Sequence, residues 1–456
     1  MSRASRRRPF DLGRGFYFLW AGESLVVVGA ALMEFALGVW VYSHTGSAVA
    51  FANVVLAATL PAVLFLPLAG GLADRVSHRA IIVCCDLSLA LLLLGVMGLL
   101  WLDRLEPLHL YLFNGLASIL AAFRKPAYQA SVNMLVAPDK FTRASGLIGI
   151  SKNASTLVVP LLAGLIMAKT GLLTILVVDL LTYCAGTLLV VKAFSHLRRA
   201  PASHGTSERG PVLRGALDNV GAALKFFSGV RLMTGLLVYS TLRTALVSLA
   251  TVMITPLLMS SLGTQALGLT YTWAGLGGLA GAGLLVIMGS PRRLMVMATV
   301  ADLLLSICLI VLGLASQTVA YCALAFCAIL AASVADAGVS AMWMNRIPAD
   351  NRASVFALIN MLAIACTSLA IFVGGWLVDH WFQPALSPGG EYVGSIGGWL
   401  GTGEGRGVGL LFVVTGVLFA LLSLGGLLYG PIRRMEGAQA GATPPPTDDP
   451  VRASAL

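Results

Sequence analysis

Two glutamates inside the first long apolar run of the sequence could exchange protons. Glu23 and Glu34 are 11 residues apart, which in a helix is three turns with an offset of about 20° and an axial separation of about 16 Å. Both carboxyl groups would therefore lie on one helix face. If the run crosses a bilayer, an acid that faces a cavity can take up a proton on one side and release it on the other. The alternative is structural, with the acid satisfied by the backbone or a hydroxyl of a neighbouring helix.

Other charged residues also fall inside apolar runs. Arg243 and Asp336 each lie roughly eight to twelve residues from one end of their runs. They could form an ion pair, either purely structural or part of substrate recognition. Asp86 is interpreted as support for the arginines at one membrane surface. Three further charges are interpreted as packing or interfacial groups: Lys152, Asp179 and Asp302.

The composition indicates a membrane protein. Of the 456 residues, 58% are hydrophobic and 11% are charged, and the mean hydropathy is +0.88, far from the values of soluble domains. The seven cysteines lack the spacing of a disulfide framework or a zinc site. The sequence has no phosphate-binding G-x-x-x-x-G-K-[ST] loop and no H-E-x-x-H. We therefore expect neither an enzyme nor a cofactor, and no nucleic-acid partner because no folded basic domain is present.

Apolar runs long enough to cross a bilayer need about 20 residues, and twelve can be drawn. The expected spans are 16–43, 47–70, 80–101, 108–133, 144–168, 172–193, 232–258, 265–289, 294–315, 318–343, 354–378 and 407–430. Lys and Arg gather in both tails and in alternate connections. The positive-inside rule therefore places both termini in the cytoplasm.

Short repeats relate the first six spans to the last six. "PDKFTRAS" follows the fourth span and "PADNRAS" the tenth, and the third and ninth spans carry Asp86 and Asp302 a few turns beyond cytoplasmic arginines. In such two-fold architectures the substrate binds near the membrane midplane, between the halves. The predicted organisation is an N-terminal half (1–193), a cytoplasmic linker with an interfacial helix (194–231), a C-terminal half (232–434) and a disordered tail (435–456).

The connection after the second span reads "GGLADRVSHRA". A glycine permits a tight turn, and a charge pair at a helix end can bond to a neighbouring helix terminus in one conformation only. The alternative is a solvated turn whose arginines set the topology. The stretch resembles the G-x-L-A-D-R-x-G-R-K loop of the major facilitator superfamily, with Ser77 and His78 where Gly and Arg are usual. The residues proposed for this conformational gate are Gly70, Asp74, Arg75 and Arg79.

A longer stretch, from about residue 16 to 434, resembles the macrolide-efflux-like branch of that superfamily, which also includes siderophore exporters. The resemblance is carried by segments such as "FALGVWVYSHTGSA", "PLAGGLADRVSHR" and "IPADNRASVFAL". It implies an all-α integral membrane protein of twelve transmembrane helices in two pseudo-symmetric halves. It also implies export driven by the proton gradient. Two antiporter motifs of related exporters are incomplete: Asn114 stands where an arginine is expected, and Val159 where a glycine is expected.

The implied fold lines its cavity with spans one, four, seven and ten. This places Glu34, Asn114, Arg243 and Asp336 around the cavity, and Trp40 would suit an apolar multispecific pocket. Proton coupling is then assigned to Glu34, Glu23 and Asp336.

The predicted function is antiport of protons against amphipathic molecules, such as macrolides, siderophores or natural products, as in multidrug resistance. We expect a monomer in the bacterial cytoplasmic membrane. Two alternatives are a lysophospholipid flippase and a non-transporting receptor or scaffold of the same fold.

Overall fold

The computed structural model describes residues 12–73, 76–137, 140–195, 231–288, 294–346, 352–390, 392–394 and 397–428. Twelve helices of at least 21 residues lie within these ranges. Nine of them are long and apolar enough to cross a membrane, while the described parts of α4, α5 and α9 fall short by length and composition. Every expected span corresponds to one of these helices.

The first six long helices form the N-terminal half of the molecule. They are α1 (Arg14–Thr45), α2 (Ala48–Ala73), α3 (His78–Trp101), α4 (Pro107–Leu135), α5 (Phe141–Thr170) and α6 (Leu172–Ser195). Helix α1 packs against α6 and α5, and α3 packs against α4 and α6. Side chains such as Leu37, Leu93 and Ile175 are fully buried in the shared core, because helices in lipid associate by close packing rather than by expelling water.

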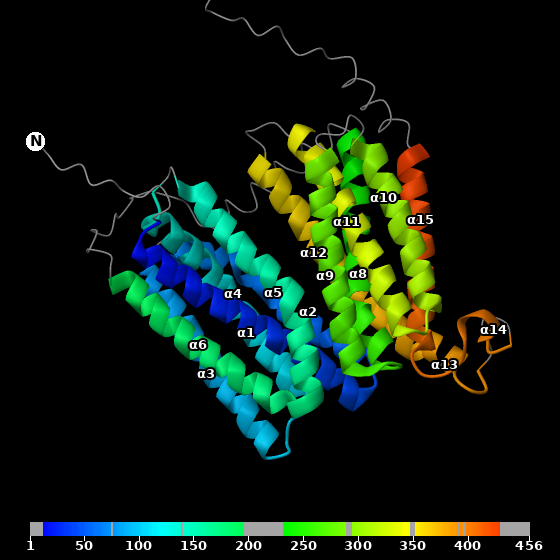
Figure 1. The fold of residues 1–456 in the computed structure, drawn as a ribbon, viewed down its shortest axis with the longest axis horizontal. Coiled ribbons are helices and arrows are strands. Elements are labelled where there is room, and N and C mark those ends of the chain that lie inside the picture. Colours follow the sequence, from blue (N-terminus) through cyan, green and yellow to red (C-terminus); the bar gives the residue numbers. More distant parts are fainter. Residues whose placement is uncertain are drawn as a thin grey trace, which may run out of the picture.

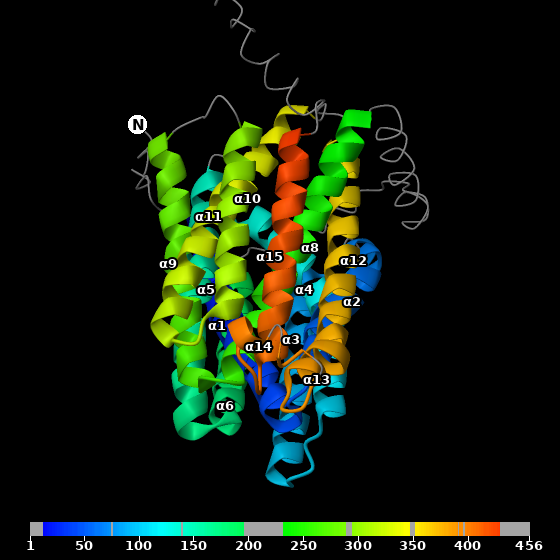
Figure 2. The ribbon, with the colours of Figure 1, turned by 90° about the vertical axis from the view of Figure 1, so that its right-hand side faces the viewer.

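The second six long helices form the C-terminal half. They are α8 (Arg231–Met259), α9 (Gly263–Met288), α10 (Leu294–Leu314), α11 (Thr318–Arg346), α12 (Arg352–Leu377) and α15 (Arg406–Leu428). Figure 2 looks onto this half, in which α15 lies between α10 and α8. Between α12 and α15 the chain forms a π-helical turn, η3 (Val378–Phe382), and the short helices α13 (Gln383–Leu386) and α14 (Gly397–Leu400), which the sequence did not predict.

The two halves meet at one end of the molecule and diverge at the other (Figure 1). One end of the molecule is the N-side: α1 and α3 begin there, and α4 and α6 end there. The opposite end is the far side. Val39 and Ala52 of the N-terminal half share a buried apolar cluster with Leu249 and Met253 of the C-terminal half. This cluster belongs to the far side, where α2 begins and α8 finishes.

Helices α5 and α9 cross closely at two glycines on the far side. A Cβ on Gly164 would lie 2.9 Å from the carbonyl oxygen of Thr264, and one on Gly268 would lie 3.0 Å from that of Pro160. Any larger side chain would therefore push the helices apart, because backbone occupies the space. The glycine pair fixes how closely the two halves approach.

Three predicted features lie outside the described residues. They are the linker with its interfacial helix, of which 196–230 are not described, the tail 435–456, and the gate residues Asp74 and Arg75.

Candidate functional site

A buried arginine joins three helices of the N-terminal half. The Arg124 guanidinium of α4 donates from Nη1 to Glu23 Oε2 of α1 over 2.7 Å and from Nε to Asp86 Oδ1 of α3 over 2.5 Å. Asp86 has no exposed surface and accepts a second bond, from Thr187 Oγ1 of α6 at 3.4 Å. Asp86 is therefore a buried partner of Arg124 and does not support arginines at the membrane surface, which corrects the sequence-based interpretation.

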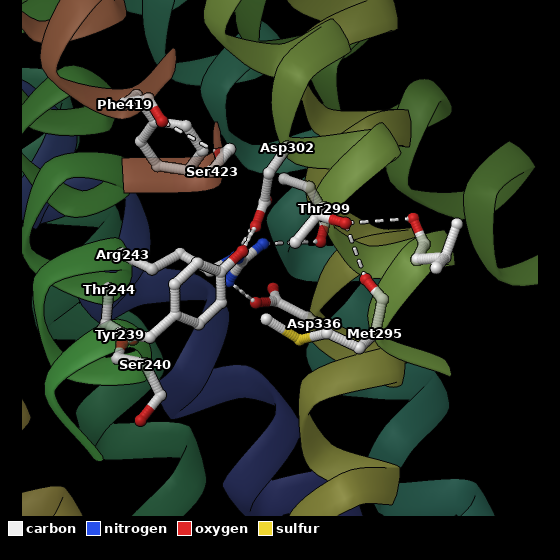
Figure 3. Close-up of polar contacts among 12 residues, drawn as sticks. Tyr239, Ser240, Arg243, Thr244, Met295, Thr299, Asp302, Asp336, Phe419 and Ser423 are labelled. Atoms are coloured by element: carbon white, nitrogen blue, oxygen red, sulfur yellow. Dashed lines mark hydrogen bonds and ion pairs between the residues drawn. The ribbon is translucent and has the colours of Figure 1, made fainter. Parts of the chain in front are cut away.

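A second buried arginine organises the C-terminal half (Figure 3). Arg243 Nε of α8 donates to both carboxylate oxygens of Asp302 of α10 at 2.9 Å, and Nη1 donates to Asp336 of α11. The Tyr239 hydroxyl also donates to Asp302. The expected Arg243–Asp336 pair is confirmed, and Asp302 proves to be its fully buried third member.

The two clusters occupy equivalent positions in the two halves but reverse the sign of charge. Asp86 lies eight residues after His78, where α3 begins, and Asp302 lies eight residues after Leu294, where α10 begins. The acid of the first helix and the arginine of the fourth in one half are replaced by an arginine in the first helix and an acid in the fourth of the other. Exposure also differs, because the Asp336 side chain is 64% exposed and that of Glu23 is 19% exposed.

A cavity of about 310 Å³ lies within the N-terminal half. Glu23 and Glu34 both line it, so the predicted shared helix face is confirmed. Asn114 lines it as well, and its buried Nδ2 atom has no hydrogen-bond partner among the described residues. Glu34 is exposed to this space, and the described part of the chain offers its carboxylate no hydrogen bond or ion pair.

Trp40 is placed differently from the expectation. It is 7% exposed, stacks on His44 with ring centroids 4.0 Å apart, and packs in the core of the N-terminal half. It does not line the cavity that holds Glu34. The reason is helical geometry. Trp40 follows Glu34 by six residues, which places it about 120° away from Glu34 around the helix axis, so its indole packs into the core.

The gate motif is described in part. Gly70 belongs to the last turn of α2, and Arg79 is exposed in the first turn of α3. Ser77 accepts a hydrogen bond from the Ala80 backbone N–H at 3.3 Å and so caps α3. The serine that departs from the usual motif therefore gives this helix its N-cap.

A carboxylate from the C-terminal half caps a helix of the N-terminal half on the far side. Asp379, in the turn η3, accepts from the backbone N–H groups of Ala48 at 2.9 Å and Val49 at 3.0 Å, and from Ser47 Oγ at 2.5 Å. The N–H groups of Ala48 and Val49 are the first of α2 and have no partners within their own helix. An anion is also favourable at this helix end, so Asp379 bonds the two halves together.

Sequence reasoning missed Arg124, Asp379 and the cavity position of Asp179. Arg124 carried a signal, since it lies well inside an expected span and an intramembrane charge marks a functional position by default. Asp379 falls one residue beyond the expected end of its span, where a charge looks like a surface residue.

Comparisons with known proteins identify the family. The sequence profile described as Major Facilitator Superfamily matches residues 19–375. The chain belongs to the major facilitator superfamily. It is also similar to Macrolide efflux protein A of Streptococcus pyogenes, with 25% identity over 377 residues that cover 80% of this chain and 91% of that protein. The predicted macrolide-efflux-like branch is thereby supported, and the superfamily is one of transporters rather than enzymes.

Solved structures agree on the fold. A mutant of the peptide transporter POT matches with a TM-score of 0.67 and 12% identity, covering 93% of this chain and 95% of that one. A bacterial homologue of the human lysosomal transporter Spinster, in an inward-facing and occupied conformation, matches with a TM-score of 0.66 and 14% identity, covering 93% and 97%. At these identities the likeness shows the fold alone, which is the predicted all-α membrane fold of two pseudo-symmetric six-helix halves.

Proposed function

We propose that this member of the superfamily exports amphipathic small molecules in exchange for protons. The macrolide-efflux relative supports export of such molecules. The observation that carries the coupling proposal is the exposure of Glu34 to a cavity inside a membrane-spanning half, with no partner among the described residues. An acid in such a position is retained for a reason other than packing.

Alternating access follows from the way the halves meet. The basic connections support the assignment of the N-side to the cytoplasm of a bacterial cell. The described arrangement, with halves apart on the N-side and bonded through Asp379 on the far side, is then the state that loads substrate from the cytoplasm. Outward opening breaks the Asp379 contacts, and the loop with Asp74 and Arg75 stabilises the outward-open state.

Two of the three proposed coupling residues, Glu23 and Asp336, belong to the charge clusters built around the buried arginines. Glu34 accepts a proton in the cavity. Glu23 lies on the same face of α1, nearer the N-side, and receives the proton next to Arg124. Protonation of Glu23 would leave Arg124 with Asp86 as its single carboxylate partner, which changes how α1 is held to α3 and α4. Asp336 is the corresponding exposed acid of the other half.

The proposal is tested by efflux from cells that express wild type, Glu34→Gln or a control, Glu404→Gln, which removes an exposed far-side glutamate. The panel contains macrolides, lipophilic dyes, siderophores and a fluorescent lysophospholipid, each with and without a protonophore. We expect wild type and the control to export at least one compound, and both the protonophore and Glu34→Gln to abolish that export at equal expression. Export that survives Glu34→Gln would remove Glu34 from the coupling mechanism, and movement of the lipid alone would favour a flippase.

A further inference from the structure

Asp179 of α6 is a buried carboxylate with an unused oxygen. The residue is 1% exposed, and its Oδ1 accepts a long hydrogen bond of 3.4 Å from Thr182 Oγ1. Its Oδ2 has no hydrogen-bond partner among the described residues. A buried carboxylate is costly unless a cation or several donors satisfy it. A cation or a hydrogen-bond donor that reached Asp179 Oδ2 would therefore be bound favourably.

This carboxylate fits against the neighbouring helix because the residue that it contacts there is a glycine. A Cβ on Gly29 of α1 would lie 2.5 Å from Asp179 Oδ1 and 2.0 Å from Thr182 Oγ1. With glycine at this position, Asp179 reaches between α1 and α6 to line the same cavity as Glu34. The sequence-based interpretation placed Asp179 among the packing charges. The residue does lie between two packed helices, and it also lines the cavity, which that interpretation did not include.

The charges around the cavity do not cancel. Arg124 also lines it but is already held by Glu23 and Asp86. Lys125 lies on the lining as well and is exposed, so water can solvate its ammonium group. Glu34 and Asp179 are thus the carboxylates left without a described cationic partner.

We propose that Asp179 and Glu34 bind the cationic group of a lipophilic organic cation, such as a protonated amine. The proposal rests on the proposed export function and names the substrate class. Val26, Met33 and Phe113 on the cavity lining supply contact for the apolar body of the ligand. Low-dielectric surroundings strengthen the attraction between a carboxylate and a cation, so charge would decide which molecules enter.

Asn114 adds a second element of recognition. Its Nδ2 atom is buried, lines the cavity and has no acceptor among the described residues. An amide N–H in this position would donate to a carbonyl, ether or hydroxyl oxygen of the ligand. A cation that carries such an acceptor should therefore bind more tightly than one without it.

The test uses two ions of the same shape and opposite charge, tetraphenylphosphonium and tetraphenylborate. Their equilibrium binding is measured with the purified full-length chain in phosphatidylcholine nanodiscs, with empty nanodiscs as the blank. We expect wild type to bind the phosphonium at least about tenfold more tightly than the borate. Asp179→Asn should weaken phosphonium binding by at least about tenfold, and Glu34→Gln, at an exposed position, should also reduce the preference for the cation.

The matched control is Asp103→Asn. Asp103 is exposed in the far-side turn between α3 and α4 with φ 52°, a conformation that asparagine tolerates. The Asp103→Asn variant should bind tetraphenylphosphonium and tetraphenylborate with the affinities of wild type. Equal binding of the two ions by wild type, no binding of the phosphonium, or wild-type affinity in Asp179→Asn would each overturn the proposal. Cellular export is measured separately, so export that persists without a preference for cations would reject the cation site and leave the proposed function standing.

Discussion

At the scale of single residues, each half is organised by one arginine that holds acids from two other helices. Arg124 and Arg243 both lie where an unpaired charge would be costly, and each has a fully buried aspartate as its inner partner. The outer partners, Glu23 and Asp336, are more exposed. Each cluster thus has one fully buried acid and one more exposed acid, and it is to the more exposed acid that we assign proton exchange in the proposed mechanism.

Removal of Arg124 should destabilise the protein because it leaves Asp86 buried without a cation. We expect Arg124→Gln to cost about 3–5 kcal/mol of stability, measured as a lower melting temperature in nanodiscs. Adding Asp86→Asn should restore part of the loss, since the uncompensated charge is then gone. A double variant that melts no higher than Arg124→Gln alone would refute this account of the cluster.

The two acids bound to Arg243 should respond differently to neutralisation. Asp302→Asn should lower the melting temperature strongly, because the buried carboxylate accepts from both Arg243 and Tyr239. Asp336→Asn should change stability by less than about 1 kcal/mol, since exposed ion pairs contribute little, yet reduce efflux. Equal melting temperatures for the two variants would contradict the assigned roles.

What the sequence could predict at this scale followed from one helix at a time. The common face of Glu23 and Glu34 needs only helical geometry, and it is confirmed. The partner of Glu23 depends on where α3 and α4 lie relative to α1, which no spacing within α1 reveals. The same limit explains why the cavity position of Asp179 was not predicted, because it depends on how α1 and α6 pack against each other.

At the scale of elements, the far-side closure depends on two helix contacts, α2 with η3 and α5 with α9. The first is a cap supplied by Asp379 and the second a close crossing at Gly164 and Gly268. Spans were predictable because a bilayer sets the length of an apolar run. The two contacts could not be predicted in this way. Neither a helix cap supplied by the other half nor a close helix crossing at glycines changes the hydropathy of the sequence.

Loss of the Asp379 cap should shift the conformational equilibrium. We expect Asp379→Ala to weaken the far-side closure by about 1–2 kcal/mol, and Asp379→Asn, which keeps the shape but loses the charge, to have a smaller effect. Spin labels at Ser195 and Ile287, both exposed near the N-side ends of α6 and α9, report the change in a background without native cysteines. The distance between the labels should shorten as the outward-open population rises.

Unchanged distances in Asp379→Ala would show that the cap does not hold the far side closed. A matched control is the same pair of labels with Asp103→Asn, which removes an exposed far-side charge away from the contact between the halves.

At the scale of the whole molecule, each of the two related halves carries a charge cluster around an aspartate at the same depth. The positions of the arginine and of the second acid are exchanged between the two clusters. The sequence repeats predicted the two halves, and the fold comparisons bear out that architecture. Coupling requires that binding in the cavity of one half alters the contact between the halves. Helix α1 provides the physical connection, because it carries Glu23 and Glu34 and packs against both α6 and α8.

The most direct test of proton-coupled export uses the purified protein in liposomes with an acidic lumen. The ligand is a compound exported by wild type in cells, and protein-free liposomes correct for passive trapping of a base. Wild type should accumulate the compound against its gradient, whereas Glu34→Gln should not accumulate it but should still exchange labelled for unlabelled compound when no pH gradient is imposed. Accumulation by Glu34→Gln equal to that of wild type, or none by wild type above protein-free liposomes, would contradict the account.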